Sequence, residues 1–187
     1  MQKPPALLDM MKALISTPSI SSANPDYDQS NRPVINLLAD WLSELGYQTE
    51  VLGIVNQPDK ANLIATLGSG PGGLVLAGHT DTVPYDEGRW NYDPFQLTSA
   101  NGRLYGLGTS DMKAFLALAI EAAAAFSPTQ FKEPLILVAT ADEESSMDGA
   151  RALSTLRSPA TKRIAKRGWL NGLSSSYGAR ASTLLAR

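Results

Sequence analysis

The sequence predicts an α/β fold with a mainly parallel central sheet flanked by helices. Segments with apolar residues at helical spacing alternate with short apolar runs that are typical of buried strands. The 187 residues are 43% hydrophobic and 18% charged, an ordinary composition for a globular protein with one sizeable core. We find no internal repeat.

Two helices are predicted before the first strand. Apolar side chains recur at helical spacing in residues 4–17, and Pro18 ends this segment. The second helix is expected to be capped by Ser30 or Asn31 and to end at Gly46, where glycine commonly terminates a helix. Its apolar stripe consists of Val34, Leu37, Leu38, Trp41, Leu42 and Leu45.

Four segments are predicted to be strands. They are residues 47–52, 62–67, 74–77 and 134–140. The last two are short apolar runs, as expected for buried strands. Residues 68–73 form a turn, and since no GxGxxG motif leads from them into a helix, they indicate no dinucleotide site. Residues 112–126 predict a third helix, and a further helix is expected to begin near Ser145 or Ser146.

The charges are distributed unevenly along the chain. All 18 acidic residues precede residue 150, whereas residues 151–187 contain eight Lys and Arg and no acid. This segment is either a basic arm for nucleic acid or an acidic partner, or a tail unrelated to the fold. The absence of interleaved aromatic and basic residues favours the tail, so nucleic acid is not an expected partner.

The composition also limits the compartment and the metal chemistry. The chain has no Cys, which excludes disulfides and thiolate metal sites. The N-terminus lacks the apolar core of a signal peptide, and no apolar run reaches the ~20 residues that span a bilayer. We therefore expect a cytoplasmic protein with no membrane partner, in which any metal is bound by oxygen and imidazole ligands.

Two polar clusters lie at the end of a predicted strand and at the start of a predicted helix. His79, the only histidine, follows residues 74–77, and Asp81 comes two residues later on the same face of an extended chain. Asp81 could orient a metal-bound His79, or the two could simply satisfy each other at the strand end. Asp111 lies between a glycine-rich loop and a helix, where it could cap the helix or bridge two cations.

The third cluster is the run of three acids 142–144, directly after the strand 134–140. Adjacent acids repel one another, although a helix N-terminus would favour them. Glu143 and Glu144 could also have different roles, in which one binds a metal ion and the other takes a proton from metal-bound water. Because the carboxyl ends of strands in an open α/β sheet meet in one crevice, the clusters together favour a site for zinc, cobalt or manganese.

These motifs, HTDTVP at 79–84, GLGTSDMK at 106–113 and ATADEES at 139–145, resemble the aminoacylase and carboxypeptidase superfamily of dinuclear zinc hydrolases. Residues 28–47 and 76–98 look most like the acetylornithine deacetylases within it. The resemblance implies an incomplete zinc-peptidase-like catalytic domain in residues 1–156, a disordered or out-of-frame tail in residues 157–187, and no dimerisation domain.

The resemblance also implies a role for each residue of the clusters. His79 would bind one metal ion, Glu144 would bind a second, and Asp111 would bridge them. Asp81 would orient His79, and Glu143 would be the general base and acid. The ions would be zinc, with cobalt as an alternative, and the reaction would be hydrolysis of N-acetylornithine to ornithine and acetate, a step of arginine biosynthesis.

The sequence departs from this pattern in two ways. It contains no second His, and no acid follows Asp148, so each metal ion would lack one protein ligand. We therefore expect this truncated chain to be inactive and not to form the homodimer of full-length relatives. The alternatives are a succinyl-diaminopimelate desuccinylase or another aminoacylase that acts on a small N-acyl amino acid, and a non-catalytic metal- or partner-binding fragment.

Overall fold

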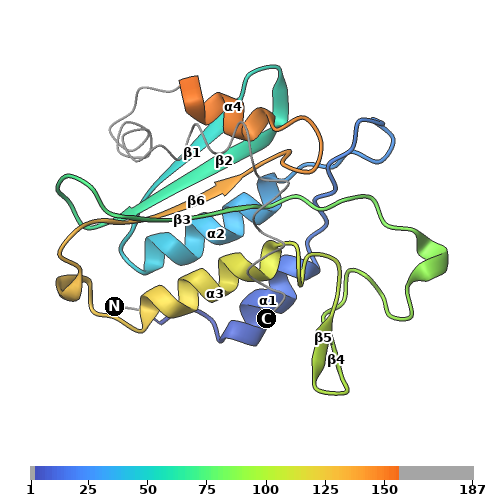
Figure 1. The fold of residues 1–187 in the computed structure, drawn as a ribbon, viewed down its shortest axis with the longest axis horizontal. Helices are drawn as coiled ribbons and strands as arrows, with labels where there is room; N and C mark the ends of the chain where they lie inside the picture. The colour runs from blue at the N-terminus through green and yellow to red at the C-terminus, as the bar shows by residue number, and fades with distance from the viewer. Residues whose placement is uncertain (1–2, 156–187) are drawn as a thin grey trace.

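A four-stranded sheet in the order β1-β2-β6-β3 forms the centre of the fold (Figure 1). The structure is a computed structural model and describes residues 3–155. The strands of the sheet are β1 (Gln48–Ile54), β2 (Gln57–Leu67), β3 (Leu74–His79) and β6 (Leu135–Thr140). All four predicted strands are therefore present, and β1, β2 and β3 extend beyond the predicted bounds.

The α/β class is confirmed, but the sheet is mixed rather than mainly parallel. β1 pairs antiparallel with β2, β2 pairs antiparallel with β6, and only β3 and β6 are parallel. For β1 and β2 the reason lies in their connection, because a two-residue link can join only antiparallel strands, whereas parallel strands need a long crossover. Residues 55–56 join β1 to β2, and Asn56 has a φ of 64°, a left-handed conformation that Asn tolerates in tight turns.

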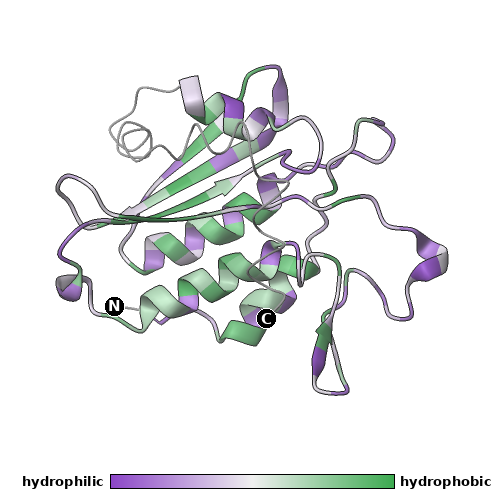
Figure 2. Cartoon of the chain, viewed as in Figure 1, coloured by the Kyte–Doolittle hydropathy of each residue, from purple (hydrophilic) through white to green (hydrophobic). Residues whose placement is uncertain are grey.

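Helices cover both faces of the sheet (Figure 1). α2 (Arg32–Glu44) and α3 (Lys113–Ala124) lie against one face, α1 (Leu7–Ile15) packs on α3, and α4 (Asp148–Thr155) lies against the other face. All six residues of β6 are buried, which explains its uninterrupted apolar sequence. α3 is apolar around most of its circumference, in keeping with its position between α1 and the sheet (Figure 2).

The predicted helices are all present, with shorter ends than expected. Gly46 has a φ of 87° and ends α2 as predicted. Asn31 occupies the N-cap position of α2, but its side chain makes no capping hydrogen bond. It instead accepts a hydrogen bond from Ala61 N–H and donates to Ala61 O, at 2.9 and 2.8 Å, so it joins the helix to β2.

One hairpin in the structure is not among the predicted elements, and one predicted segment lies outside the described residues. β4 (Thr98–Ala100) and β5 (Arg103–Tyr105) form a two-stranded ribbon that projects from the main body, and these strands are too short to give a periodic pattern (Figure 1). The basic tail expected in residues 157–187 is outside the described residues. Within residues 3–155, no helix has the length and apolar character needed to cross a membrane.

Candidate metal centre

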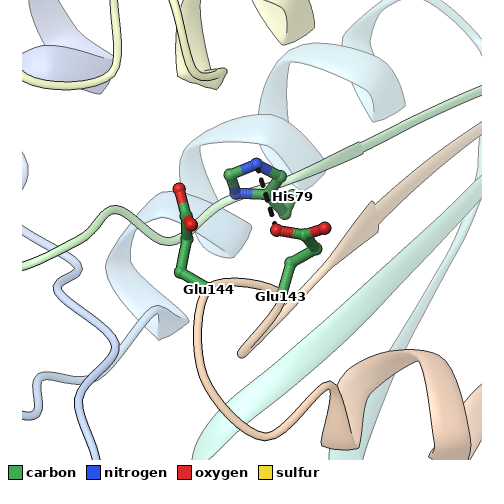
Figure 3. A group of neighbouring side chains, drawn as sticks. All are labelled: His79, Glu143 and Glu144. Carbon is green, nitrogen blue, oxygen red and sulfur yellow. Dashed lines mark ion pairs between the residues drawn. The ribbon is translucent and has the colours of Figure 1, made fainter. Parts of the chain in front are cut away.

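The parallel pair β3 and β6 brings two of the polar clusters together. His79, the last residue of β3, pairs with Thr140, the last residue of β6. Because parallel strands that end in register end at the same edge of a sheet, the residues after Thr140 emerge beside His79. Figure 3 shows the result, with Glu143 and Glu144 on one turn and both carboxylates near the imidazole.

Asp81 contacts both His79 and the glutamate turn. Nδ1 of His79 lies 3.0 Å from the backbone oxygen of Asp81 and 3.6 Å from its Oδ1. Oδ2 of Asp81 accepts a hydrogen bond from the backbone N–H of Glu144 at 3.0 Å. When Nδ1 donates to Asp81, Nε2 of a neutral His79 carries the lone pair that a metal ion needs.

Nε2 of His79 faces one predicted ligand, Asp111, and the predicted general base, Glu143. It lies 3.1 Å from Oδ1 of Asp111 and 3.8 Å from Oε2 of Glu143. One potential ligand atom from each of His79, Glu143 and Glu144 falls within 4.8 Å of the others. Asp111 stands just before α3, outside this group of three, and its side chain is 73% exposed. The other four predicted site residues thus all lie near the imidazole of His79.

The electrostatics of this cluster fit a divalent cation. Burial lowers the pKa of His79. The opposing effect of Asp81, followed by Glu143 and Glu144, is larger and raises this pKa to about 9 overall. Burial raises the pKa of both glutamates, and neighbouring carboxylates add to the effect while His79 opposes it. With Asp111, four carboxylates thus lie near a single imidazole. Oxygen and imidazole donors together suit zinc or a similar ion.

Comparison with known proteins agrees with this geometry. Residues 75–172 match the sequence profile of peptidase family M20/M25/M40. The chain belongs to this family. It is 56% identical over 151 residues to the acetylornithine deacetylase of Pasteurella multocida (strain Pm70), covering 81% of this chain and 40% of that protein. It is 54% identical over 149 residues to the acetylornithine deacetylase of Proteus mirabilis (strain HI4320), covering 80% of this chain and 38% of that protein.

The chain therefore spans about 40% of the length of the curated relatives it matches. Two solved structures show the same fold. Human carnosine dipeptidase 1 matches with a TM-score of 0.65 and 24% identity over 80% of this chain and 35% of that chain. Sso-CP2 from Sulfolobus solfataricus, an M20 family metallo-carboxypeptidase, matches with a TM-score of 0.65 and 20% identity over 82% of this chain and 36% of that chain.

In this member of the M20/M25/M40 family, two supporting contacts were not predicted. Asn31 Nδ2 donates to Oγ1 of Thr80 at 2.8 Å, and Thr80 in turn donates through its N–H and its hydroxyl to Thr140 O. Thr80 lies between His79 and Asp81, so these bonds fix that segment against β6. No feature of the sequence indicates these bonds, because Asn31 has the position of an ordinary helix cap.

The second unpredicted contact involves Lys113, the first residue of α3. Its side chain is buried, and its ammonium group donates to Thr17 O at 2.6 Å. Burial lowers the pKa of Lys113 to about 7, although the charge of Asp81 opposes this. Gly108 has a φ of 91°, and a Cβ there would come within 2.9 Å of the Lys113 side chain. Glycine therefore lets the loop that carries Asp111 pass closely over Lys113.

Proposed function

We propose that this chain provides part of the active site of a metal-dependent amide hydrolase that converts N-acetylornithine and water to ornithine and acetate. The observation that carries the proposal is the convergence of His79, Glu143 and Glu144, whose ligand atoms lie within 4.8 Å of one another. The similarity to curated acetylornithine deacetylases, at 53–56% identity, supports this choice of substrate. The reaction would serve arginine biosynthesis in the cytoplasm.

Three side chains would hold the metal. His79 would bind one ion, Glu144 would bind a second, and Asp111 would lie between them, with zinc as the expected metal and cobalt as an alternative. Bound metal supplies Lewis acidity, which polarises the amide carbonyl and acidifies water. Asp81 would orient His79 through Nδ1 and hold the Glu144 segment through its backbone N–H.

Glu143 would transfer the protons. Its carboxylate points toward the same space as Nε2 of His79, at 3.8 Å, and is partly shielded from solvent. Burial and the nearby Asp81 and Asp111 raise its pKa despite the opposing charge of His79. A carboxylate with a raised pKa is the better general base, because it binds the proton of the attacking water more readily. It would then deliver this proton to the leaving amine.

Ligand number limits what the 187-residue chain can do by itself. The sequence holds a single His and no acid after Asp148, so each ion would have fewer protein ligands than the resemblance implies. We propose that this chain binds metal weakly and hydrolyses N-acetylornithine no faster than background. Metal-dependent release of ornithine that is abolished by Glu143→Gln would contradict this.

A chimera tests the function without this limitation. The matching 151 residues of the Pasteurella multocida enzyme are replaced by those of this chain, and release of ornithine is measured. We expect an active chimera and a decrease in kcat of roughly 10²- to 10⁴-fold on Glu143→Gln, the usual range for a general base. A folded, metal-loaded chimera that does not hydrolyse N-acetylornithine but does hydrolyse N-succinyl-diaminopimelate would contradict the proposed substrate.

A further inference from the structure

The turn that carries Glu143 and Glu144 has an unfavourable backbone conformation at both ends. Asp142 has a φ of 57° and Met147 a φ of 58°, both in the left-handed region that residues other than glycine seldom adopt. The N–H of Met147 donates to Asp142 O at 2.6 Å and closes the turn. Since Asp142 directly precedes both glutamates, its conformation sets the direction in which they leave β6.

Lys60, near the start of β2, holds the side chain of Asp142. Its ammonium nitrogen lies 3.0 Å from Oδ1 of Asp142 and 2.8 Å from Oδ1 of Asp28. Lys60 and Asp142 are each only 3% exposed. Burial lowers the pKa of Lys60, but hydrogen bonds to Asp28 and Asp142 outweigh burial and raise it overall, so the side chain stays charged at neutral pH.

Two further side chains hold the same turn. Ser21 Oγ donates to Oδ1 of Asp142 at 2.9 Å. Asn62, two residues after Lys60 on the same strand, accepts from the N–H of Ala141 at 3.1 Å and donates to Gly149 O at 2.8 Å. The start of the turn is therefore fixed by contacts from β2 and from the loop after α1.

A buried ammonium group is a poor choice if packing alone is required. Removing Lys60 and its partner carboxylates from water is costly, and a well-packed apolar side chain often serves stability as well or better. An unfavourable φ also persists only where the surroundings impose it. Both observations suggest that the charge of Lys60 serves the geometry of the turn rather than the stability of the core.

We propose that Lys60 is a positioning residue of the metal centre, which acts through Asp142 to keep Glu143 and Glu144 directed toward His79. The importance of this position rests on the proposed function, in which Glu144 binds metal and Glu143 transfers protons. Lys60 itself touches none of the reacting groups, because its two ion-pair partners are Asp28 and Asp142.

Amide hydrogen exchange of Glu144 tests the proposal in the metal-free chain. This N–H donates to Oδ2 of Asp81, so it reports directly whether the turn is in place. We expect Lys60→Met to speed exchange at Glu144 by at least about tenfold, while the amide of Leu38 in α2 keeps its rate. Lys60→Arg should restore slow exchange, because it keeps the positive charge.

Two controls separate positioning from general destabilisation. Lys12→Met removes an exposed ion pair with Asp9 by the same substitution and should change neither amide. Should Lys60→Met fail to fold, Ser21→Ala removes one hydrogen bond to Asp142 and one contact with Ser145 of the same turn. It should speed exchange at Glu144 by a smaller factor than Lys60→Met. Equal acceleration at Glu144 and Leu38, or none at Glu144, would overturn the proposal.

Zinc titration then links Lys60 to the site. We expect Lys60→Met to weaken zinc binding by about 10- to 100-fold, the range typical of residues that orient metal ligands, and Lys60→Arg to preserve it. Unchanged affinity in Lys60→Met would overturn the role of Lys60 at the metal centre. If the wild-type chain binds no zinc, the weak metal binding proposed for the isolated chain fails and the chimera decides the proposed function, whereas hydrogen exchange at Glu144 still decides whether Lys60 positions the turn.

Discussion

The carboxylate of Asp81 accepts a hydrogen bond from the backbone N–H of Glu144, with 3.0 Å between Oδ2 and the nitrogen. Its other oxygen lies 3.6 Å from Nδ1 of His79. One buried side chain thus connects the end of β3 to the turn after β6. Any change in Asp81 should therefore affect both sides of the metal centre together.

Asp81→Asn tests this connection, because it removes the charge but keeps the size of the side chain. We expect the pKa of His79 to fall from about 9 toward its ordinary value of 6.5, since Asp81 is the strongest of the groups that raise it. NMR titration of the metal-free chain measures this directly, because the sequence has one histidine and hence one set of imidazole signals. An unchanged pKa in Asp81→Asn would mean that Asp81 does not control His79.

Two buried groups give opposite contributions to the pH dependence of stability. The folded-state pKa of His79, about 9, is above its ordinary 6.5. The stability that a protonated His79 contributes is therefore fully present below pH 6.5 and is lost as the pH rises to 9. The folded-state pKa of Lys113, about 7, is below its ordinary 10.5, so stability rises with pH above 7. In metal-free wild type the two slopes should largely cancel between pH 7 and 9.

Single substitutions separate the two slopes. In His79→Gln the free energy of unfolding should rise by about 2 kcal/mol from pH 7 to 9, and in Lys113→Met it should fall by a similar amount. Urea unfolding in the presence of EDTA provides the measurement. Parallel curves for wild type and both variants would show that neither group has the shifted pKa given above.

The two glutamates should behave differently in zinc titrations. Glu144→Gln removes a proposed ligand and should weaken zinc binding by more than about tenfold, whereas Glu143→Gln, which alters a proton-transfer group, should change it by less than about threefold. Isothermal titration of the two variants side by side is a matched comparison, because the residues are adjacent and the substitution is the same. If Glu143→Gln weakened zinc binding more than Glu144→Gln did, Glu143 would be the metal ligand and Glu144 the proton-transfer group.

Asn31→Asp distinguishes a helix cap from a clamp between α2 and β2. Asp is as good an N-cap as Asn, so a capping role predicts no loss of stability. Asp cannot donate to Ala61 O and Thr80 Oγ1, so the observed contacts predict a loss of about 1–3 kcal/mol in the free energy of unfolding. Asn101→Asp, in the exposed β4–β5 turn, is the control and should change stability by less than about 0.5 kcal/mol.

Much of the fold could be predicted, because the relevant signals are local. The run at β6 is apolar since both faces of that strand are covered, and Gly46 ends α2 because it must adopt a positive φ. The direction of the strands could not be predicted in the same way. β2 begins with the polar residues 57–60, so the sequence pattern does not show that only two residues separate β1 from β2. The antiparallel pairing of these two strands could therefore not be predicted.

The candidate site could be predicted to a similar extent. His79, Asp111, Glu143 and Glu144 stand where strands end or a helix starts, and their motifs resemble a known family. Lys60 could not be recognised, because its contact with Asp142 depends on the pairing of β2 with β6 across a long stretch of sequence. Residues that position a site are generally harder to find than its ligands, since only the fold brings them near it.

The most direct test of a metal centre at His79 is isothermal titration of zinc into the purified 187-residue chain, beside His79→Ala and Lys12→Met. We predict weak but saturable binding that His79→Ala abolishes and Lys12→Met leaves unchanged. Binding of the same strength in His79→Ala, or none in the wild-type chain at millimolar zinc, would contradict the assignment of this cluster as a metal centre.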